Sequence, residues 1–582
     1  PSRAHAMFAR MRLLLLGAAL VALAACTRPS TIGTTAAQGA PSYDVVIAGG
    51  KIVDGTGNPW YYGDVGIVGD RIARITPAGM LANAPARRRI DARGLVVAPG
   101  VIDIQAHSEE QLLTGDSRVV GMITQGVTTM IMGEGETPGQ VSATMLADYL
   151  KSGDTTLAPL LRTFVGPQGF GEWLKAMERH RASVNFGSFI GAGGVRQYAK
   201  NMTQGPLTPA ELDTARLVVR QAMRDGAFGL ASALIYPPGE YASTDELIEE
   251  AKASAPYGGV YITHMRSEGD RLLEAVDEAM RIGKEGGVPV EIYHLKAAGV
   301  KNWPKMRTVI AKIDSARAAG QDVTVDQYAY TAGANNLSSC IPPWAHADGK
   351  LLDRLRDPAT RARIKTEMTD EHATFESLCL GATPQGVEVT GFTVDSLKKY
   401  DGKRLPEIAA AWNEDWADAL IDLTLVEKNR LGQIIFVASD SNIATQVKLP
   451  YMKFGTDAGG YDPDSTHTAV HPRSYGTYPR ILGRFVREYK WLTLEDAVRK
   501  MTGATAARLS MRDRGELKEG WKADVMVFDP NTIIDRATYE QPHQLSVGMR
   551  YVLVNGEAVV DEGKVTGAKP GRVVRGPGNG RP

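Results

Sequence analysis

Residues near both ends of the chain alternate between apolar and polar and then turn at glycine. "YDVVIAGGKIVDGTG", starting at Tyr43, is one such stretch, and "MRYVLVNGEAVVDEGKV", starting at Met549, is another. Alternation with a period of two residues, bounded by glycine turns, is typical of β-hairpins. We therefore expect short strands over roughly 43–98 and 513–568.

Between these ends, apolar runs alternate with segments of helical periodicity. "GLVVAPGVIDIQAH" (94–107) is apolar on both faces, as a buried parallel strand is. "DRLLEAVDEAMRIGKEGG" (270–287) is an amphipathic helix pattern that ends at glycine. Further strand runs are "GVTTMIMGEG", "SVNFGSFIGAGG", "GAFGLASALIY", "GVYITHM", "GVPVEIYHL", "DVTVDQYAY" and "MKFGTDAGG". Repeated strand–helix units indicate an α/β protein with a parallel sheet, and about eight strands favour a closed (β/α)8 TIM-like barrel.

A different pattern opens the chain. Residues 11–26, "MRLLLLGAALVALAAC", have one arginine, an apolar run and a small-residue exit, which is the pattern of a secretory signal. The run is too short to span a bilayer comfortably. Its end, Leu23–Cys26, resembles a bacterial lipobox, in which the cysteine is lipidated; the alternative is a plain signal peptide with an accidental cysteine. We expect a signal peptide over 1–26, a flexible tether over 27–42, and a lipoprotein anchored to the membrane through Cys26, on the periplasmic side of a bacterial envelope.

Composition narrows the function only slightly. With 582 residues the chain should form more than one structural unit. Lysine plus arginine equals aspartate plus glutamate, at 66 each, so no electrostatic attraction to nucleic acid is expected. Two cysteines remain after Cys26. Outside the cytosol Cys340 and Cys379 could pair, and two buried free thiols are an equal alternative.

Acidic and histidine side chains follow the predicted strands where those strands end. A barrel places its chemistry at the carboxyl ends of its strands. A lone histidine at a strand end is more often a structural group, but five strand ends with such residues are hard to assign to chance. Zinc takes imidazole and carboxylate ligands, and a nearby carboxylate can transfer a proton. The residues in question are His107, Glu134, Glu136, His264, His294 and Asp457.

Several longer stretches, taken in their order along the chain, resemble the sequence motifs of a known protein family. They are "PGVIDIQAHS", "QGVTTMIMGEG", "GLASALIYPPGEYAS", "THMRSEGD", "GVPVEIYHLKAAG", "DQYAYTAG", "GTDAGG", "HPRSYGTYPRILG" and "MTGATAARL". On these stretches the chain resembles the N-acyl-D-amino-acid deacylases (D-aminoacylases) of the amidohydrolase superfamily. The resemblance runs from about Tyr43 to Gly567.

The resemblance implies both an architecture and a metal. It implies a barrel over 99–512 beside a small β-sandwich domain built from 43–98 and 513–568, which leaves 569–582 as a tail. It also implies one tightly held zinc ion, with His264 and His294 as ligands. Asp457, in "GTDAGG", falls on the family's general acid/base. Asp440, in "VASDS", looks similar but precedes a helix-like stretch and is interpreted as structural.

Two positions depart from the family pattern. The first-strand histidine pair is here Gln105 and His107, and the family's cysteine ligand aligns with Gly135. Glu134 or Glu136 must then supply a ligand, and Glu134 is favoured because it directly follows the end of the strand. A carboxylate makes the site harder, so zinc is expected while Mn²⁺ and Fe²⁺ stay open. Gln105 is a weaker ligand than imidazole, so we expect one tight ion per chain, with His107 as its neighbour or a weak ligand.

The same resemblance suggests how a substrate is held. Arg473, in "HPRSYGT", matches the family's arginine for the substrate carboxylate, and a guanidinium binds carboxylates through two parallel hydrogen bonds. Lys296, two residues after His294, is expected to join it. Tyr328 and Tyr330, placed on the strand face of Asp326 by a two-residue period, are candidate donors to the oxyanion.

These observations favour a metal-dependent amidohydrolase that cleaves N-acyl-D-amino acids or related amides with a free carboxylate. Other amide or ester hydrolases on the same scaffold, such as a dipeptidase or a lactonase, stay open, as does an inactive envelope lipoprotein. The sequence leaves open the acyl group, the side chain, the stereochemistry and the oligomeric state.

Overall fold

The computed structural model describes residues 42–151, 156–373 and 375–581. The expected signal peptide with Cys26, and residues 27–41 of the expected tether, lie outside the described residues. Within those described ranges, no helix has both the length and the apolar character that crossing a bilayer requires.

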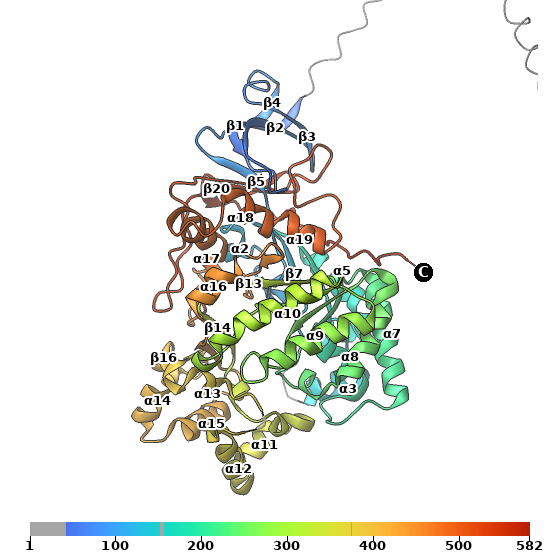
Figure 1. The fold of residues 1–582 in the computed structure, drawn as a ribbon, viewed down its shortest axis with the longest axis vertical. Coiled ribbons are helices and arrows are strands. Elements are labelled where there is room, and N and C mark those ends of the chain that lie inside the picture. The colour runs from blue at the N-terminus through green and yellow to red at the C-terminus, as the bar shows by residue number, and fades with distance from the viewer. Residues whose placement is uncertain (1–41, 152–155, 374, 582) are drawn as a thin grey trace, which may run out of the picture. The chain divides into compact units, whose positions relative to one another are not determined.

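Strands from both chain ends form one nine-stranded sheet, in the order β22-β21-β20-β19-β5-β1-β2-β3 with β4 paired to β1. β5 pairs in parallel with β1 and antiparallel with β19, and these two pairings join the chain ends. The alternating apolar residues of both ends share one buried cluster, which includes Val45, Ile47, Val525 and Val527. The strands are β1 (Tyr43–Ile52), β2 (Tyr61–Val68), β3 (Arg71–Pro77), β4 (Ala86–Asp91), β5 (Val96–Pro99), β19 (Val525–Phe528), β20 (Met549–Val554), β21 (Glu557–Asp561) and β22 (Lys564–Val565). Figure 1 shows β1–β4, in blue, above the brown β20.

The middle of the chain supplies parallel strands in two groups, β6-β7-β8 and β9-β10-β11-β12-β13-β18. Only Phe189 separates β8 from β9, and a parallel bridge joins Ala106, after β6, to Ala458, after β18. The short step from β8 to β9 and the bridge between the ends of β6 and β18 are both consistent with a closed barrel. The strands are β6 (Val101–Asp103), β7 (Val127–Met132), β8 (Asn185–Ser188), β9 (Ile190–Gly191), β10 (Gly229–Ala233), β11 (Val260–His264), β12 (Val290–Ile292), β13 (Val323–Gln327) and β18 (Met452–Phe454).

Helices alternate with these strands and cover them (Figure 1). α9 turns an apolar stripe inward that includes Leu272, Val276 and Ile282, which explains why its sequence predicted it. The covering helices are α5 (Gly169–His180), α6 (Ala192–Lys200), α7 (Pro209–Asp225), α8 (Thr244–Ser254), α9 (Leu272–Gly286), α10 (Met306–Ala318), α16 (Asp440–Gln446), α17 (Arg473–Arg480), α18 (Leu494–Met501) and α19 (Gly503–Arg508). Shorter helices near the strand ends are α1 (Glu109–Leu113), α2 (Val120–Ile123), α3 (Ala143–Lys151) and α4 (Ala158–Thr163).

The apolar run at 94–107 is not the single parallel strand that its sequence predicted. It divides into β5, in the nine-stranded sheet, and β6, in a parallel sheet. The break falls at Pro99 and Gly100. Proline cannot donate to a ladder, and Gly100 packs so closely that a Cβ there would lie 2.1 Å from the Thr128 side chain. The run therefore passes from one sheet to the other at Gly100, where a residue with a Cβ would clash with Thr128.

A unit that the sequence did not indicate lies between β13 and β18. Its four-stranded antiparallel sheet, β14-β17-β15-β16, packs on helices around a separate apolar cluster that includes Val387, Ile408 and Leu420. A disulfide joins Cys340 to Cys379, which resolves the two alternatives left open above. The elements are β14 (Ala332–Asn336), β15 (Val387–Thr390), β16 (Lys403–Arg404), β17 (Gly432–Phe436), α11 (Leu351–Arg356), α12 (Pro358–Thr369), α13 (Leu378–Ala382), α14 (Leu405–Trp412) and α15 (Trp416–Val426). We call residues 332–437 the inserted unit; Figure 1 shows its helices at the end away from β1–β4.

Residues 569–581, the described part of the predicted tail, pack against the rest of the chain. The Gly571 N–H donates to Ala182 O at 2.8 Å, and the Val574 N–H donates to Phe186 O at 2.7 Å. Val573 forms a parallel bridge with Phe186 of β8. This segment therefore lies along the edge of β8. The sequence did not indicate this contact, because the segment has no alternation of apolar and polar residues.

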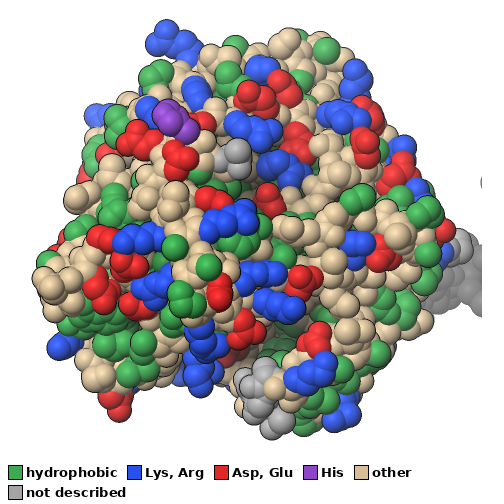
Figure 2. Space-filling model, turned by 90° about the horizontal axis from the view of Figure 1, so that it is seen from below, with side chains coloured by type: hydrophobic (Ala, Val, Ile, Leu, Met, Phe, Trp, Pro, Cys, Tyr) green, Lys and Arg blue, Asp and Glu red, His purple; other side chains and the backbone are tan. Residues whose placement is uncertain are grey.

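Acidic and basic side chains are interspersed on the surface that Figure 2 shows. On the face shown in Figure 2, acidic and basic side chains alternate without a large patch of one sign. This distribution accords with the equal numbers of the two kinds of charge.

Candidate metal centre

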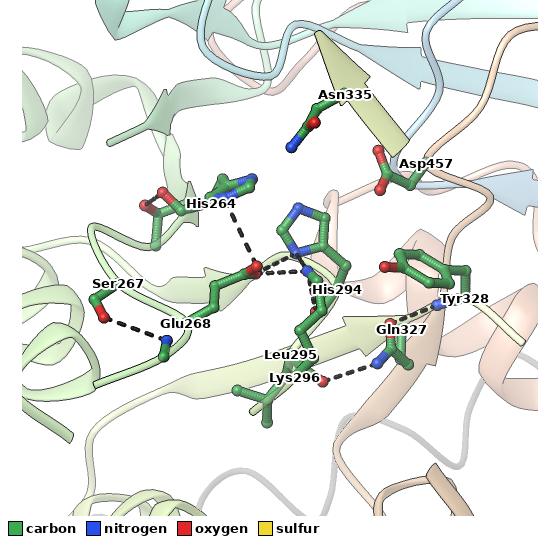
Figure 3. A network of polar contacts seen from close by, with 12 residues as sticks. His264, Ser267, Glu268, His294, Leu295, Lys296, Gln327, Tyr328, Asn335 and Asp457 are labelled. Carbon is green, nitrogen blue, oxygen red and sulfur yellow. Dashed lines mark hydrogen bonds and ion pairs between the residues drawn. The ribbon is translucent and has the colours of Figure 1, made fainter. Parts of the chain in front are cut away.

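Three side chains converge at the carboxyl ends of β7, β11 and β12. Glu134 follows β7, His264 ends β11, and His294 lies just after β12. Glu134 Oε1 is 3.0 Å from His264 Nδ1 and 3.5 Å from His294 Nε2. Parallel strands bring these ends together even though the residues are far apart in sequence. Figure 3 shows the two imidazoles beside each other, and their rings meet edge to face with centres 4.5 Å apart.

These three residues fit a zinc ion by their own chemistry. Each can offer one ligand atom, and the three atoms lie within 4.8 Å of one another. His264 Nε2 is buried without a hydrogen-bond partner among the described residues. Burial would raise the pKa of Glu134, but hydrogen bonds with His107, His264 and His294 outweigh it and hold that pKa well below its usual range. Two imidazoles and an ionised carboxylate form the ligand set of a catalytic zinc site.

Glu134 also belongs to a second group, with His107 and Asp457. His107 Nε2 is 3.1 Å from Asp457 Oδ1 and 3.3 Å from Glu134 Oε2. The two oxygens of Glu134 therefore face different partners: Oε1 faces the two buried histidines, and Oε2 faces His107. One carboxylate is thus shared between two potential metal positions.

Gln105 occupies the place where the family pattern has a histidine, and it contacts Glu134. Its amide nitrogen donates a hydrogen bond to Glu134 Oε2 at 2.5 Å. An amide nitrogen has no free lone pair for a metal, so in this orientation Gln105 orients Glu134 rather than acting as a ligand. Its amide oxygen is buried without a partner among the residues described.

Glu268 is a functional residue that the sequence reasoning missed. Its carboxylate is 3.1 Å from His294 Nδ1 and 2.6 Å from Lys296 Nζ (Figure 3). Burial would raise the pKa of Glu268, but the positive charges of Lys296, His264 and His294 lower it well below its usual range. For His294 to offer Nε2 to a metal, its proton must sit on Nδ1, where Glu268 is the acceptor within reach and Lys296 Nζ, a donor only, lies 2.8 Å away. Its position four residues after His264 was the available signal, but no strand end marks it.

Backbone geometry singles out two of these residues. His294 has φ 33° and Asp457 has φ 52°, in the left-handed region that residues other than glycine rarely adopt. Buried hydrogen bonds hold both: the His294 N–H donates to Asp326 Oδ1 and the Asp457 N–H donates to Gln105 O, each at 2.8 Å. Such backbone strain is concentrated at functional sites.

Arg473 and Asp457 form a buried ion pair, Nη1 to Oδ2, at 2.6 Å. Burial would raise the pKa of Asp457, but Arg473 and then His107 lower it. The Arg473 guanidinium lies 4.8 Å from the ring centre of Tyr328, and its Nε has no hydrogen-bond partner within the described ranges. Lys296, by contrast, forms an ion pair with Glu268, Nζ to Oε1 at 2.6 Å, and does not lie free beside Arg473 to bind a carboxylate.

The two tyrosines predicted as oxyanion donors lie in different surroundings. Tyr328 lines the cavity beside His294 and Arg473, but Tyr330 is not part of that lining. β13 ends at Gln327, so the two-residue period that put both on one face does not extend to Tyr330. The Tyr330 ring lies 5.4 Å from His471 and beneath Arg480 instead.

Two acidic residues lie outside the three-residue groups. Glu136 lines the cavity, and burial raises its pKa, but it does not join the cluster around Glu134. Asp440 is the exposed first residue of α16, as its structural interpretation predicted.

The cluster opens into a cavity of about 820 Å³. One side consists of the strand-end residues above, with Tyr236 from the turn after β10. The opposite side comes from the inserted unit and includes Asn335, Ser339 and Gln433. The inserted unit therefore supplies a wall of the site.

Comparison with known proteins gives a consistent picture. The family model described as "Amidohydrolase family" matches residues 430–560. The D-aminoacylase of Alcaligenes xylosoxydans xylosoxydans is 33% identical over 536 residues, covering 91% of this chain and 97% of the relative. A solved structure of D-aminoacylase, described through its binuclear metal centre with one-metal activation and second-metal attenuation, has a TM-score of 0.75 at 31% identity and covers 92% of this chain and 100% of its own. The N-acyl-D-glutamate deacylase of Bordetella bronchiseptica, solved with zinc and a phosphonate inhibitor, has a TM-score of 0.74 at 29% identity, with coverages of 92% and 100%.

Proposed function

Because the chain belongs to the D-aminoacylase family of amidohydrolases, we propose that it hydrolyses the amide bond of N-acyl-D-amino acids at the cluster around Glu134. The chain is a metal-dependent hydrolase of linear amide C–N bonds. The convergence of Glu134, His264 and His294 beside Asp457 and Arg473 is the observation that carries the proposal. The alternatives of a lactonase, a dipeptidase or an inactive lipoprotein are not favoured by these relatives.

Glu134, His264 and His294 would hold the essential zinc, and Glu268 would fix the proton of His294 on Nδ1. When bound, zinc supplies Lewis-acid chemistry and makes water a stronger nucleophile near neutral pH. The carboxylate in place of the family's thiolate keeps Mn²⁺ and Fe²⁺ open as substitutes.

Asp457 would act as the general acid/base. Its low pKa keeps it ionised at neutral pH, so an oxygen of its carboxylate can accept the proton of the attacking water. The same oxygen would then deliver that proton to the leaving nitrogen. Tyr328, whose hydroxyl has no partner among the described residues, would donate to the developing oxyanion.

Arg473 would bind the substrate carboxylate. Asp457 holds one end of the guanidinium, and the unpartnered Nε remains able to donate. Lys296 would support this role by its charge, through Glu268 and His294, rather than by direct contact.

We propose one tight ion per chain. The second group has one imidazole where the first has two, its Asp457 is already paired with Arg473, and Gln105 adds no ligand because it turns its nitrogen towards Glu134. Gln105→His should raise the metal content at saturating zinc with little change in kcat. Two tight ions in the unmodified protein, measured by metal analysis, would contradict the proposal.

For the architecture, we propose that the parallel strands close into a (β/α)8 barrel over 99–512. Residues 43–98 and 513–568 would form a small β-sandwich beside it. The bridge from Ala106 to Ala458 supports closure of the barrel, and the pairing of β5 with β19 supports a β-domain built from both chain ends.

For localisation, we propose an envelope lipoprotein anchored through Cys26, on the basis of the pattern at residues 11–26. Several acyl chains would be needed, because one acyl chain holds a protein only marginally. Cys26→Ser should release the protein from the membrane fraction, and unchanged fractionation would contradict the anchor.

Hydrolysis of a substrate panel tests the activity. The zinc-loaded protein should cleave N-acetyl-D-amino acids faster than their L-enantiomers, their methyl esters, dipeptides or lactones. Equal rates for the free acids and their methyl esters would contradict the role of Arg473. A lactone or an L-enantiomer as the best substrate would contradict the proposed reaction.

A further inference from the structure

We infer that the pocket selects D-amino acids with uncharged side chains and discriminates against D-aspartate and D-glutamate. This inference rests on the proposed function, because it concerns the substrate of the same site. It follows from the charges, hydrogen bonds and apolar groups of the cavity wall.

The cavity has very few cations. Lys296 and Arg473 are the only lysine and arginine among the described residues that line it. Lys296 is buried and paired with Glu268 at 2.6 Å. Arg473 is needed for the substrate's α-carboxylate. A second carboxylate on the amino-acid side chain therefore finds no lysine or arginine of its own.

Two imidazoles of the wall that lie away from the metal cluster, those of His346 and His471, do not supply that charge. Burial lowers the pKa of His346 to about 4, and burial followed by the charge of Arg473 lowers the pKa of His471 well below its usual range. Both rings are therefore neutral at pH 7. His471 is also fully used, because Nε2 contacts Ala332 O and Nδ1 accepts from the Arg473 N–H.

Three polar residues of the inserted unit that line the cavity bond to one another. Gln433 donates from its amide nitrogen to Asn335 Oδ1 at 2.7 Å and to Ser339 Oγ at 2.9 Å. Asn335 donates in turn to the Tyr236 hydroxyl at 3.0 Å. Figure 3 shows Asn335 at the edge of the space between His264 and Asp457. Both amide hydrogens of Gln433 are thus used, and the second Asn335 N–H and the Tyr236 O–H are uncharged donors that cannot neutralise a carboxylate.

The wall also has an aliphatic part. It includes Ile341, Leu378, Ile434, Ile435 and Val437. A carboxylate moved here would lose its water without gaining a partner, which is costly, whereas an apolar or amide side chain would not. The two sulfur atoms of the Cys340–Cys379 disulfide face the Gln433 amide oxygen and hold this wall together.

A matched panel of substrates tests the inference. N-acetyl-D-methionine, -leucine and -asparagine are compared with N-acetyl-D-aspartate and -glutamate on the zinc-loaded protein. We expect kcat/KM for the two acidic substrates to be lower by about 100-fold, the loss that one unpaired buried polar group causes. Equal or faster cleavage of D-aspartate or D-glutamate derivatives overturns the inference and leaves the proposed function intact.

Binding separates this inference from the proposed reaction. The same panel is titrated into zinc-loaded Asp457→Asn by calorimetry. A protein that cleaves none of the panel contradicts the proposed function, while the order of the Kd values still tests the charge selectivity. Tighter binding of the uncharged members supports the inference; tighter binding of the acidic members overturns it.

Two variants at one position test the cause. Asn335→Lys and Asn335→Leu both remove the amide, and only the first adds a cation to the wall. Asn335→Lys should recover about tenfold or more in kcat/KM for N-acetyl-D-glutamate relative to Asn335→Leu, with no such gain for N-acetyl-D-leucine. An equal loss for both substrates in both variants would contradict selection by charge.

Discussion

Glu134 offers its two carboxylate oxygens to two different sets of side chains. Oε1 faces His264 and His294, whereas Oε2 faces His107 and accepts from Gln105. A cysteine at this place would present one sulfur to both sets, and Gly135 offers nothing. Glu134 thus offers two hard oxygen atoms where a cysteine would offer one soft sulfur. The hydrogen bond from Gln105 to Oε2 fixes which oxygen faces His107 and which faces the two buried histidines.

Asp457→Asn should separate proton transfer from metal binding. The amide is close in size but cannot accept a proton at neutral pH, so kcat should fall by about 10²–10⁴-fold while the metal content stays unchanged. His264→Ala should lose the metal itself. Metal analysis beside initial rates distinguishes these outcomes, with Asp440→Asn as the control that keeps both. A variant Asp457→Asn that keeps a tenth of the rate would exclude the proposed role.

Glu268→Gln should weaken zinc binding without removing a ligand. The variant leaves His294 Nδ1 without its carboxylate acceptor and Lys296 without its counter-charge. Loss of such an outer partner commonly costs about 10–100-fold in metal affinity. Competition with a zinc chelator measures it. Glu278→Gln, which instead frees Arg266, is the matched control, and equal zinc affinity in both variants would count against Glu268.

At the scale of elements, α8 carries a buried acid without a partner. Both carboxylate oxygens of Glu250 lack hydrogen bonds among the described residues. Burial, and then the charge of Glu246, raise its pKa well above the usual range, against the weaker effect of Arg196. Because the pKa is raised in the folded state, the stability is greatest below the ordinary value of about 4.3 and falls as pH rises above it.

Glu250→Gln should therefore stabilise the protein, and the gain should grow with pH. Melting temperatures at pH 5 and pH 8 measure it, with a larger increase at pH 8. Glu249→Gln is the control on the same helix, because Lys252 and Arg216 lower the pKa of Glu249 and its contribution is lost as pH falls. A gain of equal size at both pH values would mean that the charge of Glu250 is not the cause.

Some elements could be predicted from the sequence because their patterns are local. β11, β12 and α9 have uninterrupted apolar runs or a full helical stripe, and the proposed ligands His264 and His294 follow directly from the strand ends. The inserted unit could not be predicted, because its core is formed by segments distant in sequence. Glu268 was missed for a related reason: its role depends on Lys296 and His294, which only the fold brings beside it.

At the scale of the whole molecule, the last residues of the chain are part of the packed structure. Deleting 569–582 should lower the melting temperature, because it removes the hydrogen bonds of Gly571 and Val574 and uncovers the edge of β8. Deleting only 579–582, which is exposed over 579–581, is the control. Thermal unfolding measures both, and equal melting temperatures for the two truncations would show that the segment contributes nothing.

The shared sheet also fixes the order of events during synthesis. The Ile75 N–H bonds to the carboxylate of Glu519, 444 residues later, and β5 pairs with β19. While the ribosome is still making the middle of the chain, β5 has emerged but its neighbour β19 has not. The sheet is completed only by nearly the last codons, and until then the side of β5 that will pair with β19 is an open edge of the kind that pairs with other chains. A protein built this way reaches its final state only after translation is nearly finished.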